Sequence, residues 1–364
     1  MGLSLKNIFS SIQAPEQGSP ESVVGVDIGS SSIKVVEIMH TEKALMLRTY
    51  GELQLGPYAD KPLGESVSLE QKSLTEALVD VIRESGVKAQ NSVLAIPLDS
   101  SFVTVVPVTV KKGEKLEAKI NVESRKYIPV PLAEVILDWS ELGQYGDSDE
   151  EVHEVLLAAI QNDAFARYQE LMATIKMVAQ PSEIEVFSTI RGTFHSDDTT
   201  LAVLDLGAEA SKLFIAKDGA LERIHRVYEG GTNCTKRIAH LLDVPFAEAE
   251  EMKRTYSEGA EHARDIYKAY ISSLERSILE FKRVIDQYET RSGEKIARTV
   301  ITGGAAQFPS VIPYVQDALS REVTMVNPFD KVAYPAFMED TLSEIGVTFS
   351  TALGAALRPF EMGS

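Results

Sequence analysis

Two short stretches of the chain share one pattern of apolar and polar positions. Each begins with an apolar run and continues with Asp, an apolar residue, Gly, several small or polar residues and Lys; they are Val23–Lys34 and Leu201–Lys212. A short apolar run bounded by glycine is typical of a strand buried on both faces. Asp27 and Asp205 are 205 − 27 = 178 positions apart in a chain of 364 residues. The pattern therefore predicts two similar halves, each opening on a buried strand that ends in a tight turn.

The rest of the pattern predicts the alternating strands and helices of an α/β protein. Alternating or β-branched apolar residues favour strands, and apolar positions three and four apart favour helices. The predicted strands are 34–38, 45–55, 92–97, 102–110, 135–139, 152–159, 298–302 and 323–326. The predicted helices are 74–83, 115–126, 165–175, 181–191, 308–319 and 349–357. An apolar stripe from Tyr267 to Tyr288 fits either a core helix or a coiled-coil contact.

Breaks in this pattern divide the chain into five parts. Residues 1–22 contain Pro, Gly and Ser and are predicted to be a flexible lead, with a short binding helix as the alternative. The other parts are a first-half core (23–90 and 179–199), an inserted small α+β subdomain (91–178), a second-half core (200–236 and 298–360) and a helical subdomain (237–297).

The two predicted turns have the chemistry of a polyphosphate site. Gly29 and Gly207 leave room for a ligand against the backbone. The hydroxyls of Ser30–Ser32 lie beside successive amides, which together suit a phosphate. Asp27 and Asp205 precede the turns and could hold Mg²⁺ through its water ligands. The competing interpretation is a pair of ordinary β-turns, but the repetition at half the chain length favours nucleotide binding.

Composition limits the classes of partner. There are 36 Lys and Arg against 54 Asp and Glu, a formal net charge of −18, which argues against nucleic acid and against direct binding to an anionic membrane. One cysteine permits no internal disulfide, so a reducing compartment is expected. No stretch approaches the roughly 20 apolar residues of a membrane span, and we expect no secretory signal.

Three segments carry a resemblance to a known family. Asp27–Glu37 resembles the first phosphate loop of the actin-like ATPases, and Val300–Ala306 resembles their adenosine loop. The segment Glu123–Trp139, which reads Glu-Ser-Arg-Lys-Tyr-Ile-Pro-Val-Pro-Leu-Ala-Glu-Val-Ile-Leu-Asp-Trp, is similar to the PilM family of type IV pilus assembly proteins, relatives of the division protein FtsA. The resemblance implies an actin-like (ribonuclease H-like) duplicated α/β fold with a nucleotide cleft between two halves.

The resemblance also implies a set of site residues for ATP and Mg²⁺. Glu250 and Lys253, three apart on a predicted helix, match a pair beside the ribose in FtsA-like proteins, although a surface ion pair is equally compatible with them. Gly230 and Gly231 precede a helix whose first amides could meet phosphate, or they form an ordinary helix entry. The full set of expected nucleotide-binding residues is Gly29, Ser30, Ser31, Ser32, Lys34, Gly207, Ala208, Gly230, Gly231, Glu250, Lys253, Gly303, Gly304 and Ala305.

Catalysis is expected to be slow at most. In actin-like folds a polar residue on the connecting helix orients the attacking water, and Glu183 is the candidate, with Gln180 behind it; the alternative is that Glu183 merely favours the helix N-terminus. Asp27 and Asp205 complete the catalytic candidates and are also the expected metal residues. Ala208 and Glu209 replace the Gly and Gly or Thr usual in efficient actin-like ATPases, which puts fast hydrolysis in doubt.

The family resemblance also implies a partner and a place in the cell. PilM proteins bind the cytoplasmic N-terminal tail of the inner-membrane protein PilN, so we expect a scaffold that is cytoplasmic and peripheral to the inner membrane through that partner. Little follows Pro359, where FtsA carries a membrane-binding helix. The pilus assembly ATPases and a second copy of the chain are further candidate partners. The alternative functions are an FtsA-like filament-forming ATPase and, with less support, a sugar-kinase-type phosphotransferase.

Overall fold

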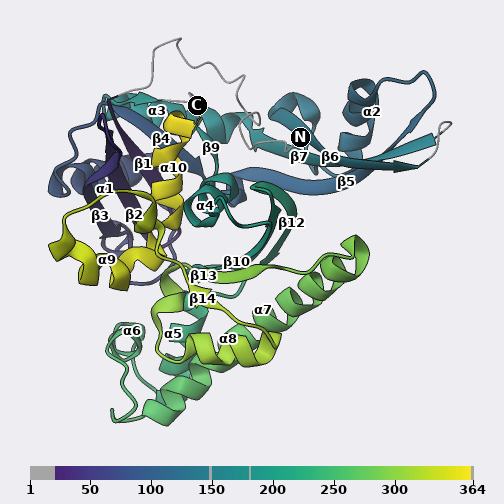
Figure 1. Ribbon diagram of the computed structural model, residues 1–364. Coiled ribbons are helices and arrows are strands. Elements are labelled where there is room, and N and C mark those ends of the chain that lie inside the picture. The colour runs from purple at the N-terminus through teal and green to yellow at the C-terminus, as the bar shows by residue number, and fades with distance from the viewer. Residues whose placement is uncertain (1–20, 147–149, 180–181, 362–364) are drawn as a thin grey trace.

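The computed structural model describes residues 21–146, 150–179 and 182–361. The predicted lead lies largely outside these residues, and Gln180 lies wholly outside them. Within them the chain forms three β-sheets with helices around them (Figure 1). None of the helices in these ranges is both long and apolar enough to cross a bilayer.

The first sheet has the strand order β3-β2-β1-β4-β8, with β9 also paired to β4. Its strands are β1 (Ser22–Ile28), β2 (Ser32–His40), β3 (Leu45–Gln54), β4 (Asn91–Ile96), β8 (Val178–Ala179) and β9 (Glu183–Ile184). Alternate residues point to opposite faces, and both faces are covered. Helices α1 (Gln71–Glu84) and α3 (Asn162–Thr174) pack on one face, and α10 (Ser350–Glu361) packs on the other. This accounts for the nearly continuous apolar run of β1.

The second sheet repeats this arrangement with the order β12-β11-β10-β13-β14. Its strands are β10 (Thr200–Leu206), β11 (Ser211–Lys217), β12 (Ala220–Val227), β13 (Arg298–Thr302) and β14 (Thr324–Met325). One face packs against α5 (Gly231–Leu242), α7 (Ala263–Ser292) and α8 (Val311–Leu319), and α6 (Phe246–Arg254) lies beside α5. The apolar stripe of α7 lies in this core, as a core helix requires.

A third sheet, with the order β5-β7-β6, extends to one side of the molecule (Figure 1). Its strands are β5 (Ser101–Lys111), β6 (Val135–Gly146) and β7 (Glu150–Gln161), and α2 (Leu116–Glu123) packs against it. The inserted region was predicted to be 91–178. However, β4 belongs to the first sheet and α3 packs on that sheet, so the part that stands apart runs only from β5 to β7.

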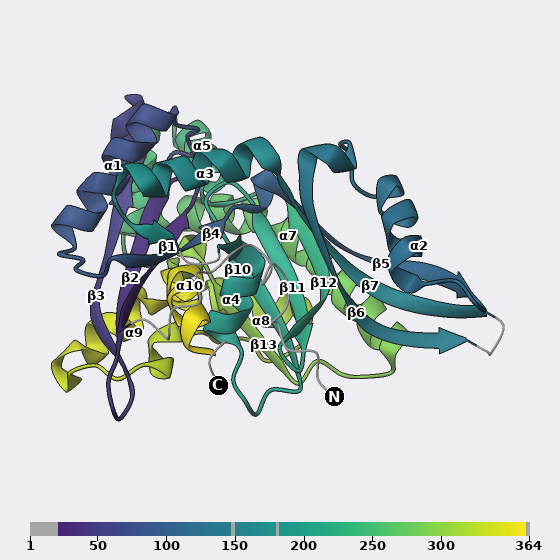
Figure 2. The ribbon, with the colours of Figure 1, turned by 90° about the horizontal axis from the view of Figure 1, so that it is seen from above.

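Two helices lie between the first and second sheets: α4 (Glu185–Thr193) and α10 (Figure 2). They cross very closely, because a Cβ built on Gly354 would lie 1.8 Å from the Ser188 carbonyl oxygen. The helix predicted to begin at 181 begins at Glu185. Since α10 packs on β1 and β2, the second-half core predicted to reach residue 360 loses its last helix to the first half. The remaining helix is α9 (Glu339–Ile345).

Candidate functional site

The strands β1 and β10 each run parallel to one neighbour and turn back into another. Asp27 pairs with Lys34 across β1 and β2, and Asp205 pairs with Lys212 across β10 and β11. The Gly29 amide donates to the Ser32 carbonyl (3.0 Å), and the Gly207 amide donates to the Ala210 carbonyl (3.1 Å). The two turns therefore have the same hydrogen-bonded form, as their shared sequence pattern predicts.

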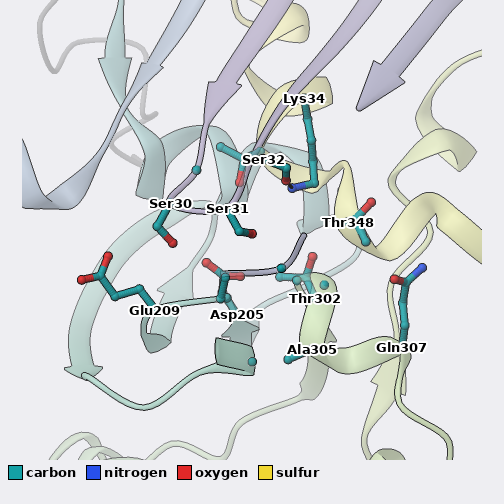
Figure 3. A pocket seen from close by; sticks show the side chains of 18 of the residues that line it. Ser30, Ser31, Ser32, Lys34, Asp205, Glu209, Thr302, Ala305, Gln307 and Thr348 are labelled. Carbon is teal, nitrogen blue, oxygen red and sulfur yellow. Dashed lines mark hydrogen bonds between the residues drawn. The ribbon is translucent and has the colours of Figure 1, made fainter. Parts of the chain in front are cut away.

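Both turns line one cavity of about 690 Å³, and the loop after β13 lines it as well. Its size lies within the range of small-molecule sites, roughly 300–1,000 Å³. In Figure 3 the serines of the first turn face Asp205 and Thr302 across this space. The structure brings together these predicted residues: Asp27, Gly29, Ser30, Ser31, Ser32, Lys34, Asp205, Gly207, Ala208, Gly231, Glu250, Lys253, Gly303, Gly304 and Ala305.

Two cross-strand rows of charge face the cavity. Lys34 on β2 pairs with Glu52 on β3, which extends the first row to Asp27–Lys34–Glu52. Lys212 on β11 pairs with Arg226 on β12, which extends the second row to Asp205–Lys212–Arg226. Directly opposed residues point to the same face of a sheet, so each row presents its side chains together. All six residues line the cavity.

The lysine of the first row is paired within its own sheet. The Lys34 ammonium donates to Ser32 Oγ (2.7 Å) and lies 3.5 Å from Glu52 Oε1. Burial raises the pKa of Asp27 to about 6, although the Lys34 ammonium acts in the opposite direction. A cation placed beside Asp27 would stabilise the ionised form of this carboxylate.

The second row is tied to the helix between the halves. Lys212 Nζ lies 3.0 Å from Glu185 Oε1 and 3.3 Å from Asp205 Oδ2. Burial alone would lower the pKa of Lys212, but the carboxylates of Glu185 and Asp205 raise it above its ordinary value. Lys212 is thus a buried permanent cation among carboxylates.

Glu183, the predicted water-orienting residue, does not reach the cavity. It is 2% exposed, and Arg191 Nη2 (3.0 Å) and Arg358 Nη1 (3.2 Å) bind its carboxylate. Glu185 lines the cavity instead and accepts from the Leu98 amide (2.9 Å). The helix begins later than predicted: β9 continues through Ile184, so the first helical residue is Glu185, and Glu185 is the glutamate that reaches the cavity.

The start of α5 also differs from the expectation. The amides of Gly231 and Thr232 donate to the carbonyl oxygens of Gly207 and Ala208, both at 2.9 Å. These amides therefore support the second turn and are not available to a phosphate. Gly230 lies behind the turn and is not among the residues that line the cavity.

The far end of the cavity has a polar side and an aromatic side. Glu250 is 4% exposed and is bound by Lys253 (2.6 Å), Arg254 (2.7 Å) and Thr235 Oγ1 (2.5 Å), so it is not a surface ion pair. Tyr270 stacks on Phe308 with ring centroids 3.8 Å apart, and both line the cavity. Sequence reasoning missed the lining residues Tyr270, Gln307, Phe308, Arg226 and Arg254, none of which lies in a glycine-rich motif.

The family model for type IV pilus assembly protein PilM matches residues 25–360, which is most of the chain. The chain belongs to the PilM family. Among solved structures, a PilM–PilN type IV pilus biogenesis complex is similar, with a TM-score of 0.76 and 24% identity over 93% of this chain and 98% of that one. The ethanolamine utilization protein EutJ from Carboxydothermus hydrogenoformans has a TM-score of 0.55 and 16% identity over 97% of this chain and 93% of that one.

A third similar structure is MreB5 of Spiroplasma citri bound to AMPPNP, with a TM-score of 0.50 and 10% identity over 96% of both chains. These likenesses confirm the predicted actin-like fold of two halves. The family match confirms the resemblance carried by Glu123–Trp139, which lies within the matched range.

In this member of the PilM family the described residues contain no group of three or more His, Cys, Asp or Glu side chains placed to hold a metal ion. Asp27 and Asp205 are the acidic residues that precede the two turns, and both line the cavity. Such a pair fits Mg²⁺, which keeps most of its water ligands and takes others from a bound phosphate. Figure 3 shows the Glu209 carboxylate directed away from Asp205, so it does not join this pair.

Proposed function

We propose that this protein is an ATP-binding scaffold of the type IV pilus assembly platform. The observation that carries the proposal is the convergence of the two matched turns and the Gly303–Gly304 loop on one cavity. The family match supports the role in pilus assembly, and the AMPPNP bound to a relative of the same fold supports the nucleotide.

Each part of the cavity has a role that its chemistry supports. The hydroxyls of Ser30–Ser32 and the Lys34 ammonium bind the phosphates, and the amides of both turns add donors. The Glu250 carboxylate accepts from the ribose, and the base lies beside Gly304 and Ala305. Asp27 and Asp205 hold the water ligands of Mg²⁺, which supplies positive charge to the phosphates.

Hydrolysis is slow in this proposal, and Glu185 is the residue that orients water. Its Oε1 is occupied by the Leu98 amide and by Lys212, at 2.9 and 3.0 Å. These two donors hold Oε1 in place and occupy it, so this oxygen is not free to accept a proton from water. The site thus favours binding over turnover.

We further propose that the protein acts in the cytoplasm and reaches the inner membrane through the N-terminal tail of a PilN-like protein. The PilM–PilN complex supports this partner, and the net charge of −18 favours a basic or apolar tail. Co-purification with a synthetic tail of the cognate protein tests this part. A folded protein that retains no tail contradicts it, whatever its affinity for nucleotide.

Calorimetric titration with ATP and Mg²⁺ tests the nucleotide site. Asp27→Ala and Asp205→Ala are expected to weaken binding by at least tenfold, because each removes a carboxylate that holds the metal's water ligands. Asp286→Ala on α7, which removes an exposed carboxylate, is the matched control and is expected to bind as the wild type does. Equal affinity in all four proteins overturns the site.

A second candidate function is an FtsA-like filament-forming ATPase. The resemblance of the phosphate loop Asp27–Glu37 to the actin-like ATPases, which include FtsA, is its support. Sedimentation with ATP and Mg²⁺ distinguishes the two functions, because a filament pellets at high speed and a monomeric scaffold does not.

A further inference from the structure

Arg226 is a cavity residue for which the nucleotide-binding pattern gives no role. It stands next to Lys212 across β11 and β12, on the face that carries Asp205. Its guanidinium lies over the Tyr228 ring, 4.6 Å from the centroid, which limits the positions open to it. The second row therefore ends in a positioned guanidinium on the cavity wall.

The partner of this guanidinium comes from the other half of the molecule. Arg226 Nη1 donates to Asp99 Oδ1 at 2.6 Å. Asp99 lies in the short 3-10 turn Leu98–Ser100, which joins β4 of the first sheet to β5 of the inserted subdomain. This turn, the root of the inserted subdomain, thus contacts the cavity wall through Asp99.

A second contact joins the same root to the cavity. The Leu98 amide donates to Glu185 Oε1, and Lys212 binds that same oxygen. Two adjacent residues of the root are therefore held by cavity residues, one through a guanidinium and one through a carboxylate. A change at this end of the cavity acts directly on the position where the inserted subdomain leaves the first sheet.

The contact of Arg226 with Asp99 is easily exchanged. The Asp99 side chain is 62% exposed, and an exposed ion pair contributes little to stability. A terminal phosphate carries more charge than a carboxylate and matches the planar fork of a guanidinium. When a nucleotide with a terminal phosphate occupies the cavity, the Arg226 guanidinium makes a stronger interaction by turning from Asp99 to that phosphate.

We propose that Arg226 binds the terminal phosphate of the nucleotide in exchange for Asp99, and so releases one of the two contacts that hold the root of the inserted subdomain. This rests on the proposed function, because it requires a nucleoside triphosphate in the cavity. A triphosphate reaches Arg226 and a diphosphate does not, so the inserted subdomain distinguishes the two. The face presented by β5 to β7 is then coupled to the state of the nucleotide.

Affinity measurements with two nucleotides test the phosphate contact. For Arg226→Gln we expect about a tenfold loss of affinity for a non-hydrolysable ATP analogue with Mg²⁺, and at most a twofold change for ADP. The matched control is Arg223→Gln on the same strand, which loses a contact to Glu154 (3.2 Å) of the inserted subdomain but does not line the cavity. It is expected to bind both nucleotides as the wild type does.

The outcomes separate this proposal from the function on which it rests. No binding of either nucleotide to the wild type defeats the proposed function itself. Binding by the wild type, with equal losses for both nucleotides or none in Arg226→Gln, overturns the role of Arg226 and leaves the proposed function standing.

A double-mutant cycle tests the exchange. Asp99→Asn removes the competing carboxylate and is expected to raise affinity for the ATP analogue several-fold in the wild-type background. In the Arg226→Gln background the same change is expected to have little effect, because no guanidinium remains to be released. An equal gain in both backgrounds means that Asp99 acts only through its charge, which contradicts the exchange.

Amide hydrogen exchange tests the coupling without any measurement of turnover. Exchange over 98–104 is expected to be faster with the ATP analogue than with ADP, and the difference is expected to vanish in Arg226→Gln. The Arg223→Gln control retains the difference. Identical exchange with both nucleotides in the wild type overturns the coupling.

Discussion

The two halves present the same backbone to the cavity but differ in charge at one matched position. The first row, Asp27–Lys34–Glu52, ends in a carboxylate, and the second, Asp205–Lys212–Arg226, ends in a guanidinium. In the first half Lys34 is satisfied by Glu52 and Ser32 of its own sheet. In the second half Lys212 and Arg226 reach Glu185 and Asp99, which belong to the first half.

This difference shows what duplication conserves and what it leaves free. The turn geometry is the same in both halves, because each turn is closed by the same amide-to-carbonyl hydrogen bond from its glycine. The third position of each row lies outside the turn, so its charge could diverge. In the first row the lysine is paired within its own sheet, while the lysine and arginine of the second row contact residues of the other half.

The largest expected effect comes from making the two central strands alike. Gly25 in β1 matches Val203 in β10, but a Cβ on Gly25 would lie 1.9 Å from the Ala352 carbonyl oxygen of α10. Gly25→Val is expected to lower the free energy of unfolding by more than about 5 kcal/mol, because backbone cannot move aside as a side chain can. Denaturant unfolding measures it. Val203→Ala, the control, is expected to cost about 1–3 kcal/mol; similar losses in both contradict the packing described.

The next largest effect distinguishes Glu183 from Glu185, two glutamates at the start of α4. Glu183→Gln leaves Arg191 and Arg358 without their buried carboxylate, and we expect a loss of about 3–5 kcal/mol in unfolding free energy. Nucleotide affinity is expected to stay unchanged. Glu185→Gln is the matched variant, with a smaller loss of stability and a changed rate of ATP hydrolysis. A loss of nucleotide affinity in a folded Glu183→Gln protein would falsify the assignment.

The contribution of Glu183 to the free energy of unfolding also depends on pH. Burial alone would raise the pKa of Glu183, but Arg191 and Arg358 lower it below the ordinary 4.5. A lowered pKa in the folded state gives stability that is present above pH 4.5 and lost as the pH falls through the folded-state value. The difference between wild type and Glu183→Gln should therefore shrink in acid, as measured by unfolding at a series of pH values.

A smaller effect concerns Asp27 in the first row. Its pKa of about 6 lies above the ordinary 3.8, so the folded chain holds this proton more tightly than the unfolded chain does. The stability from this group is full below pH 3.8 and lost as the pH rises through 6. Asp27→Asn is expected to gain about 3 kcal/mol relative to the wild type across this window, at 1.36 kcal/mol per pH unit. A difference in unfolding free energy that stays constant with pH contradicts this expectation.

The smallest effect is at a direct contact between the halves. Ser66 Oγ lies 2.8 Å from Thr232 Oγ1, and Thr232 donates to the Gly64 carbonyl (3.1 Å). Ser66→Ala is expected to cost about 1 kcal/mol of unfolding free energy, the ordinary contribution of one hydrogen bond. Ser68→Ala, two residues further along the same loop, serves as the control. A loss above about 3 kcal/mol would show that more than this bond holds the cleft.

The two turns could be predicted from the sequence because the residues that form each turn are adjacent in the chain. The segments Asp27-Ile-Gly29 and Asp205-Leu-Gly207 each predict a tight turn after a buried strand, and their spacing indicates the duplication. The packing of α10 on β1 was not predictable in this way, because it joins positions more than 300 residues apart. The pattern of apolar and polar residues along the chain does not predict such a contact.

The site was predictable where a motif carries it and not elsewhere. Glu183 was chosen over Glu185 because a helix start is uncertain by a few residues, and two residues decide which side chain reaches the cavity. Arg226 depends on the register of β12 against β11, which includes a bulge at Ile215 and Ala216. Because of this bulge, the partner of Lys212 cannot be found by counting residues outward from the hairpin turn.

The close crossing of α4 and α10 has a mechanical consequence. Gly192 and Gly354 bring backbone against backbone there, since a Cβ on Gly192 would lie 2.1 Å from the Ser350 carbonyl oxygen. Thr189 Oγ1 and Thr351 Oγ1 also meet there at 2.8 Å, so the two helices resist separation at this point, and we infer that it is the pivot about which the halves turn. Motion about a pivot is small near the axis and grows with distance from it. Opening the molecule should therefore widen the rim near Ser66 and Thr232 far more than it displaces the strands beside the crossing.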